Sequence, residues 1–319
     1  MEERTPLTLN LLFFEQKKIL FGEFEFDSVD DHNIQLSDET VELMVQREEE
    51  HLPRDDYLKN LRSRESNMSI VRNQALDWIL KAHAYFGFGP WSFFLSINYF
   101  DRFLSLSKLP RGINWFAQLL ATACLQIAAK MGETKVPPYA RLQVGSPKFI
   151  FEALTIQRME LLVLSTLGWK MQAITPFSFI GYFISKITYE KHQMKSSLSK
   201  SVKLMLSIST CIDFLEFRAS EIAAAVAISV TRELEAKEIH KALSSLAMVK
   251  KDRILKCLEL MRDMSMVKVS GNLSSNLSPA GVLNCACSSF KSDELTVPSV
   301  SSNTERKSNN VPSDETYKS

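Results

Sequence analysis

Apolar side chains recur every three or four residues through most of this chain, which is the spacing typical of amphipathic helices. The least polar stretch, residues 112–129, contains no charged side chain and ends at Lys130. Its length approaches that of a membrane span, but polar side chains recur in it at every fourth position: Asn114, Gln118, Thr122 and Gln126. The pattern therefore predicts a helix at the centre of a soluble bundle, with one polar line that leads to Lys130 at its end.

A second apolar stretch, residues 219–230, is rich in alanine, and Ser220 is a candidate N-cap for its helix. Small side chains let neighbouring helices approach closely, so this helix also suits the centre of a bundle. Segments with helical period precede and follow each of the two stretches, and the sequence has no convincing strand-like alternation. We therefore predict an all-α fold with a duplicated helical unit.

The first half of the chain has the clearest helical pattern. Apolar side chains share one face from Val71 to Phe86, and this pattern ends at Gly87-Phe88-Gly89-Pro90. Pro137-Pro138 breaks the chain further on, and we expect a short helix after it. The four longer helices of this half are expected at residues 71–86, 91–104, 112–130 and 151–167. Five more helices fit between residues 176 and 264.

Helix start and stop signals divide the chain into four parts. Ser37 can cap a first helix, which should stop before Pro53. Thr175-Pro176 starts the helical pattern again, and the residues after Val269 are rich in Ser and Asn and poor in large apolar side chains. We expect the following parts: residues 1–65 with one helix at about 38–52, a five-helix domain at 66–172, a second at 173–268, and a disordered tail at 269–319.

The charge balance excludes several classes of partner. Lys and Arg number 38 against 37 Asp and Glu, so the chain has no basic surface for direct binding of nucleic acid or of an anionic membrane. The five cysteines are odd in number and lie mostly in apolar helices, which is typical of a reducing compartment. The first residues are too acidic for a signal peptide. We expect an intracellular, soluble protein.

Catalytic motifs are absent from the sequence. It contains no His-Glu-x-x-His, phosphate loop or nucleophile elbow, and its five histidines are scattered. We therefore expect a binding protein without cofactor or metal, although a helical enzyme with an unrecognised site stays an alternative.

Five ordered segments have a distinctive sequence. They are Val-Arg-Asn-Gln-Ala-Leu-Asp-Trp-Ile at 71–79, Ile-Asn-Tyr-Phe-Asp-Arg-Phe-Leu at 97–104, Ala-Ala-Lys-Met-Gly-Glu-Thr at 128–134, Ile-Gln-Arg-Met-Glu-Leu-Leu-Val-Leu at 156–164, and Leu-Glu-Phe-Arg-Ala-Ser-Glu-Ile at 215–222. Together they resemble the cyclin family, and the plant D-type cyclins in particular, from about residue 37 to 264. The resemblance implies two tandem five-helix cyclin-box domains in a regulatory subunit. Such a subunit binds and activates a cyclin-dependent kinase in G1/S control.

The resemblance also implies roles for two pairs of charged residues. Arg72 and Asp101 match a buried ion pair between the first two helices of the box, although the residues alone suggest solvated surface charges. Lys130 and Glu160 match the pair that contacts the kinase. Without the resemblance, Glu160 is a carboxylate within an apolar run, and it belongs either to an exposed stripe or to an interface.

Two features of the first domain depart from the family pattern. A pair of glutamates follows the lysine in the family, but here the residues are Gly132 and Glu133, so one acidic contact near the kinase is lost. The family's substrate-docking patch presents Met, Leu and Trp, which correspond to Val71, Ala75 and Trp78. The small side chain of Ala75 weakens this patch and argues against the docking of short Arg-x-Leu peptides.

The N-terminal segment departs from the family as well. D-type cyclins carry Leu-x-Cys-x-Glu there, which binds a retinoblastoma-related protein, whereas this chain has Leu11, Phe13 and Glu15 at the matching positions. The larger Phe13 side chain predicts a motif that is lost or binds weakly. Kinase-inhibitor proteins are further partners that the resemblance implies. Ser278, which precedes Pro279, is a candidate phosphorylation site in the tail.

A second class of function stays open from the sequence. The cyclin fold also occurs in scaffolds that activate no kinase and in transcription-associated protein-binding modules. The transcription factors with this fold carry basic surfaces for DNA, and the nearly neutral charge of this chain argues against that version.

Overall fold

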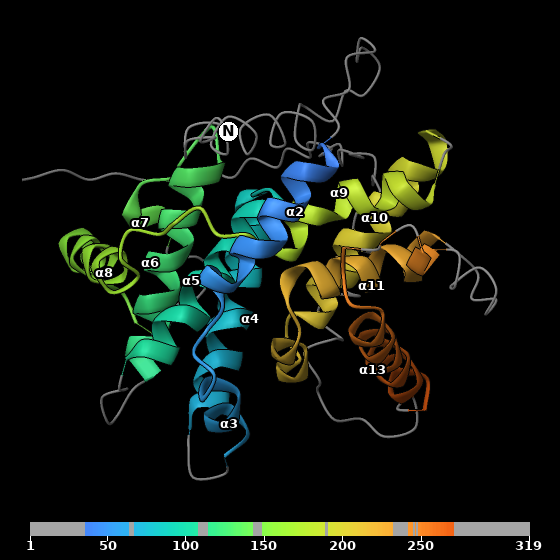
Figure 1. Cartoon of the computed structure of the whole chain (residues 1–319). Helices are drawn as coiled ribbons and strands as arrows, with labels where there is room; N and C mark the ends of the chain where they lie inside the picture. Colours follow the sequence, from blue (N-terminus) through green and yellow to red (C-terminus); the bar gives the residue numbers. More distant parts are fainter. Residues whose placement is uncertain are drawn as a thin grey trace, which may run out of the picture. The chain divides into compact units, whose positions relative to one another are not determined.

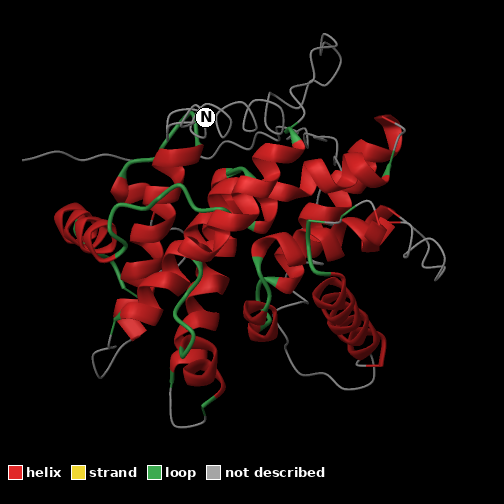
Figure 2. Cartoon of the chain, in the orientation of Figure 1, coloured by secondary structure: helices red, strands yellow, loops and turns green. Residues whose placement is uncertain are grey.

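The computed structural model describes residues 36–63, 67–107, 114–142, 149–188, 191–231, 242–244, 246 and 248–270. Figure 1 shows the chain and Figure 2 its secondary structure, and the described residues contain helices and connecting turns but no strand. The all-α prediction is thus confirmed. The degenerate motif at Leu11, Phe13 and Glu15, the candidate site Ser278 and nearly all of the predicted tail lie outside the described residues.

The first half of the structure is built around α6 (Asn114–Gly132), as the polarity pattern predicts. This helix packs against α4 (Met68–Phe86), α5 (Pro90–Leu106) and α8 (Ala153–Thr166), and the short α7 (Tyr139–Leu142) lies between α6 and α8 in the chain. None of the described helices is both long and apolar enough to cross a membrane. The apolar side chains of α6 instead fill the core: Leu119, Leu120, Ala123, Cys124, Ile127 and Ala128 are all buried.

The polar line along α6 anchors the chain that connects it to α8. The side-chain amide of Gln118 donates a hydrogen bond to the Phe149 carbonyl at 2.9 Å, and that of Gln126 donates to the Pro137 carbonyl at 3.3 Å. Backbone groups of a connecting segment need partners once they leave water. Side chains of the central helix supply these partners, so the line seen in the sequence serves internal contacts.

The turn between α4 and α5 follows from its glycines and proline. Gly87 ends α4 with a left-handed φ of 62°, which favours glycine, and Pro90 starts α5 at its first position. The carboxylate of Glu133 accepts hydrogen bonds from the Gly89 N–H at 2.9 Å and from the Ser92 hydroxyl. A residue distant in sequence therefore supplies an acceptor to the backbone N–H just before α5 and to a hydroxyl in its first turn.

The second half has its own central helix, α11 (Ala219–Thr231). It packs against α9 (Pro176–Ile187), α10 (Lys191–Ile208) and α13 (Lys251–Ser270), and most of its alanines are buried. The 3-10 turn η2 (Ile212–Glu216) precedes it. Small side chains permit these close contacts, as predicted.

Ser220 is not the N-cap of α11, because the helix already begins at Ala219. Its backbone N–H and its hydroxyl both donate to the Glu48 carboxylate at 2.8 Å. Burial raises the pKa of Glu48, although the hydrogen bonds from Ser220 act in the opposite direction.

The N-terminal segment differs from the prediction of a single helix at about 38–52. Helix α2 (Asp38–Arg47) ends earlier and continues as the 3-10 turn η1 (Glu48–His51), and a further helix, α3 (Tyr57–Arg62), follows. A helix of six residues, three of them apolar, is too short to show a clear helical period, so α3 was not evident in the sequence. Its stability comes from packing, since Tyr57 is buried and Arg62 donates to Asp213 at 2.6 Å.

Candidate functional site

Arg72 of α4 and Asp101 of α5 form a buried ion pair. Arg72 Nε lies 2.8 Å from Asp101 Oδ1 and Arg72 Nη2 lies 3.0 Å from Oδ2, while the two residues are 1% and 2% exposed. This geometry agrees with the role that the family resemblance implies and overturns the interpretation as solvated surface charges. The two hydrogen bonds of this bidentate pair offset part of the cost of burying both groups inside the bundle.

Two further contacts extend this pair to neighbouring elements. The Tyr57 hydroxyl of α3 donates to Asp101 Oδ1 at 2.7 Å, and Arg72 Nη2 also donates to the Ser209 carbonyl, just after α10, at 3.1 Å. Burial acts to lower the pKa of Arg72, but the Asp101 carboxylate outweighs it, so the pKa is raised. Burial and Asp101 together raise the pKa of Tyr57 well above its ordinary value. The network joins the two halves of the structure.

Lys130 and Glu160 contact each other directly. Lys130 Nζ lies 2.8 Å from both carboxylate oxygens of Glu160, whose side chain is 7% exposed, whereas the Lys130 side chain is 44% exposed. Glu160 thus belongs to no exposed stripe. Its carboxylate lies under a half-exposed ammonium group, which is the member of the pair that solvent or a partner can reach.

Tyr139 completes this arrangement, and sequence reasoning did not find it. Its hydroxyl donates to Glu160 Oε2 at 2.8 Å and accepts from Lys130 Nζ at 3.0 Å. Burial acts to lower the pKa of Lys130, but the hydrogen bonds to Glu160 and Tyr139 outweigh it and raise the pKa. Lys130 is therefore charged at neutral pH. The only available signal in the sequence was an aromatic residue directly after Pro137-Pro138.

Exposed apolar side chains lie on α8 and on its two flanks. We call this set the α8 surface: Ile150, Leu154, Leu161, Leu162 and Trp169. Leu154 and Leu161 are seven residues apart and so share one face of the helix. Glu160 precedes Leu161 directly. The chain therefore exposes large apolar groups on the same helix that carries the buried carboxylate.

Trp169 has an unusual backbone conformation. Its φ is 61°, directly after Gly168 with φ 59°, and the residue is 65% exposed. A left-handed conformation costs a residue with a bulky side chain on the order of 1–2 kcal/mol. The carbonyls of the next two residues are held by Arg102 and by the Tyr99 hydroxyl. The fold thus retains a strained turn that projects a tryptophan into solvent, which favours a contact role for it.

Gly132, which stands where the family has a glutamate, lies where a side chain has little space. A Cβ at this position would lie 2.5 Å from Ser92 Oγ and 3.1 Å from the Trp91 ring, so a larger residue must displace the start of α5. Glu133, the acidic residue that remains, accepts its hydrogen bonds from Gly89 and Ser92. It therefore contacts the N-terminus of α5.

The structure leaves little of the predicted docking patch accessible. Val71 and Ala75 are 3% and 1% exposed, and Trp78 is half-buried. The indole N–H of Trp78 is buried and has no hydrogen-bond partner among the described residues. Two of the three positions are therefore core residues, and they do not form an open groove.

Comparison with known proteins agrees with this architecture. The model of the cyclin N-terminal domain matches residues 39–172, and that of the cyclin C-terminal domain matches residues 174–278. Cyclin-D4-1 of Arabidopsis thaliana is 44% identical over 265 residues, which are 81% of this chain and 83% of that protein. Cyclin-D4-2 of the same species is 46% identical over 267 residues, which are 83% and 87% of the two chains.

A solved structure supports the fold alone. The viral cyclin from herpesvirus saimiri is similar with a TM-score of 0.54 and 16% identity, covering 61% of this chain and 84% of that one. The two halves of this chain are matched in turn by the cyclin N-terminal and C-terminal domain models. The matching domain models and the plant relatives show that this chain belongs to the cyclin family.

Proposed function

We propose that this chain binds and activates a cyclin-dependent serine/threonine kinase, and that it thereby promotes the G1/S transition. The observation that carries the proposal is the half-exposed Lys130, fixed by Glu160 and Tyr139 next to the helix of the α8 surface. A charged donor beside exposed apolar groups has the composition of a protein interface, in which apolar contacts supply affinity and charged groups fix the orientation.

The geometry of Lys130 suits recognition of a partner's acceptor groups. Its ammonium group has three donors, and the structure directs it at two oxygens of Glu160 and one of Tyr139. Because its position is set before binding, less side-chain entropy is lost on association. A kinase that offers a backbone carbonyl or a carboxylate here would replace one of these bonds.

Activation needs no chemistry from this chain. A protein kinase requires its own Lys–Glu ion pair and an ordered activation loop for phosphoryl transfer. A partner that binds the active conformation more tightly than the inactive one shifts the population towards it. We therefore infer a regulatory role, with all catalytic groups on the kinase.

Further partners and the location of the protein belong to the same proposal. Weak or absent binding of a retinoblastoma-related protein is supported by Phe13 in the N-terminal motif, and kinase-inhibitor proteins are expected through the kinase complex. The proposed site of action is the nucleus and cytoplasm, and imaging of a fluorescent fusion tests it. Exclusion from both compartments would contradict it.

The decisive experiment replaces Lys130 and Glu160 together by Ala. Loss of a desolvated charged contact costs on the order of 2–5 kcal/mol, so co-purification with a cyclin-dependent kinase and phosphorylation of a retinoblastoma-related peptide should both fall steeply. A matched control replaces Asp77 and Lys81, an exposed ion pair on α4, and should bind normally. Undiminished binding by the Lys130/Glu160 variant, with helicity intact, would refute the site. Binding without activation by the unmodified chain would favour a non-activating scaffold.

A further inference from the structure

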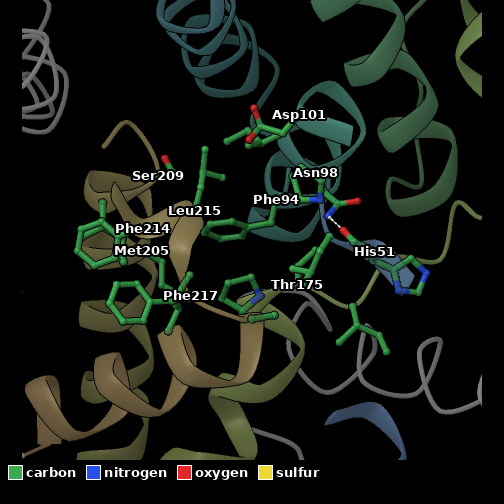
Figure 3. Close-up of a pocket in the computed structure, with 18 of the residues that line it drawn as sticks. His51, Phe94, Asn98, Asp101, Thr175, Met205, Ser209, Phe214, Leu215 and Phe217 are labelled. Carbon is green, nitrogen blue, oxygen red and sulfur yellow. Dashed lines mark hydrogen bonds between the residues drawn. The ribbon is translucent and has the colours of Figure 1, made fainter. Parts of the chain in front are cut away.

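A cavity of about 130 Å³ lies between the two halves of the structure. Helix α5 supplies one side of it, and α10, η2 and the start of α11 supply the other (Figure 3). Most of its wall is apolar, including Phe94, Ile97, Met205, Phe214 and Phe217. Ligand sites in proteins are typically apolar cavities of this kind, often between domains, with a few polar groups that orient the ligand.

The polar end of the cavity lies around Asp101, at the top of Figure 3, whereas the rings of Phe214 and Phe217 lie lower. Most polar groups at that end already have partners. Asn98 donates to the His51 carbonyl, and the Ser209 hydroxyl donates to the Leu206 carbonyl. The Asp101 carboxylate accepts from Arg72 and Tyr57. The acceptors at this end are thus engaged.

Two buried nitrogens of residues that line the cavity have no hydrogen-bond partner among the described residues, Arg72 Nη1 and His51 Nδ1, and only the guanidinium nitrogen is a donor in every case. Arg72 lines the cavity and is 1% exposed, and its Nη1 has no hydrogen-bond partner among the described residues. Its Nε and Nη2 are used by Asp101 and Ser209. A buried guanidinium N–H without an acceptor is unfavourable. A molecule in the cavity that brings an acceptor oxygen would remove this penalty.

We propose that the cavity binds a small neutral molecule with an apolar body and one acceptor oxygen, which accepts a hydrogen bond from Arg72 Nη1. The body has about the size of one aromatic ring, because an apolar cavity of ~150 Å³ takes up benzene. The ligand is neutral because Asp101 already balances Arg72, and a second buried carboxylate would have no counter-ion. A ketone, ether or ester of this size fits the description.

The cavity is reachable from solvent. Leu52 at its rim is 38% exposed, and Leu215 and Ile222 are half-buried. The cavity shares no residue with the α8 surface, so this inference stands independently of the proposed kinase contact. Because the walls come from both halves, a bound molecule would stabilise the contact between them.

The test uses the full-length chain and two probes of equal shape, acetophenone and α-methylstyrene, in which a CH₂ group replaces the ketone oxygen. Acetophenone should raise the melting temperature in a concentration-dependent way and shift the NMR signals of residues that line the cavity. The olefin should bind about tenfold to a hundredfold more weakly, because it leaves the Arg72 donor unpaired.

A substitution at the rim locates the site. Ile222→Trp should fill the cavity and abolish the acetophenone response, whereas Leu255→Trp, on the exposed face of α13, should leave it unchanged. Leu215→Trp serves the same purpose if Ile222→Trp does not fold. The proposal is overturned if neither probe binds, if both bind equally, or if the folded rim variant binds as well as the unmodified chain.

Discussion

Removal of one partner of the Arg72–Asp101 pair tests whether this buried network holds the first domain together. Asp101 is 2% exposed in the unmodified chain. If the Arg72→Ala variant keeps this geometry, the Asp101 carboxylate retains, among the described residues, only the Tyr57 hydroxyl as a donor. Breaking a buried ion pair in this way costs about 3–5 kcal/mol. The Ser209 carbonyl also loses its donor. Since domains are stable by only about 5–15 kcal/mol, a large part of the stability should disappear.

The double variant Arg72→Met/Asp101→Leu separates the cost of an unpaired buried charge from the cost of losing the hydrogen bonds to Tyr57 and Ser209. It removes both charges and fills their volume with apolar groups, a change that is often neutral for a buried pair. The Tyr57 hydroxyl and the Ser209 carbonyl are left without these partners, which costs about 1–3 kcal/mol for each buried group. We therefore expect the double variant to lose less stability than the sum of the two single Ala variants, Arg72→Ala and Asp101→Ala.

Urea unfolding followed by circular dichroism measures these free energies. The exposed pair Asp77 and Lys81 on α4 is a matched control, with an ion-pair distance of 2.6 Å and side chains that are 44% and 60% exposed. Its removal should cost only about 0.3–0.5 kcal/mol. If the free energies of unfolding of the single variants at Arg72 and Asp101 lie within about 1 kcal/mol of that of the unmodified chain, the buried network contributes little to stability.

Three other predictions concern different parts of the chain. Burial, followed by the charge of Arg102, lowers the pKa of His51 from 6.5 to about 4, so the unfolded state binds more protons between these values. The free energy of unfolding should therefore fall by up to about 3 kcal/mol as the pH drops from 6.5 to 4, and a His51→Gln variant that kept the same pH slope in urea titrations would contradict this. Gly132→Ala should lower stability by about 1–3 kcal/mol, since its Cβ meets Ser92 Oγ, and thermal melts should show partial recovery when Ser92→Ala is added. Phe13→Cys should raise the affinity of a peptide of residues 5–20 for a retinoblastoma-related pocket by about tenfold to a hundredfold, because overfilling a formed pocket costs about 1–3 kcal/mol. Equal affinities of the unmodified peptide and its Phe13→Cys version in a fluorescence titration would refute the argument from side-chain size.

Local sequence determined the main helices of this protein. The four longer helices predicted in the first half, from 71–86 to 151–167, were observed as α4, α5, α6 and α8, with ends that differ by up to three residues. The apolar period of these helices and the Gly and Pro residues at their ends are local signals, which extend over a few residues. The helices can therefore be recognised without tertiary information. The charge-free stretch before Lys130 likewise predicted the central helix α6.

The contacts that build the candidate site were decided by tertiary structure. From the residue types alone, Arg72 and Asp101 were expected on the surface, and only the family resemblance implied that they are buried. Tyr139, the strained Trp169 and the inward-facing Glu133 were not predicted at all. Each depends on groups far away in the chain, such as Glu160 for Tyr139 and Gly89 for Glu133. Hydrophobic period reports which face of a helix is buried, but it does not report which side chain of another helix lies opposite.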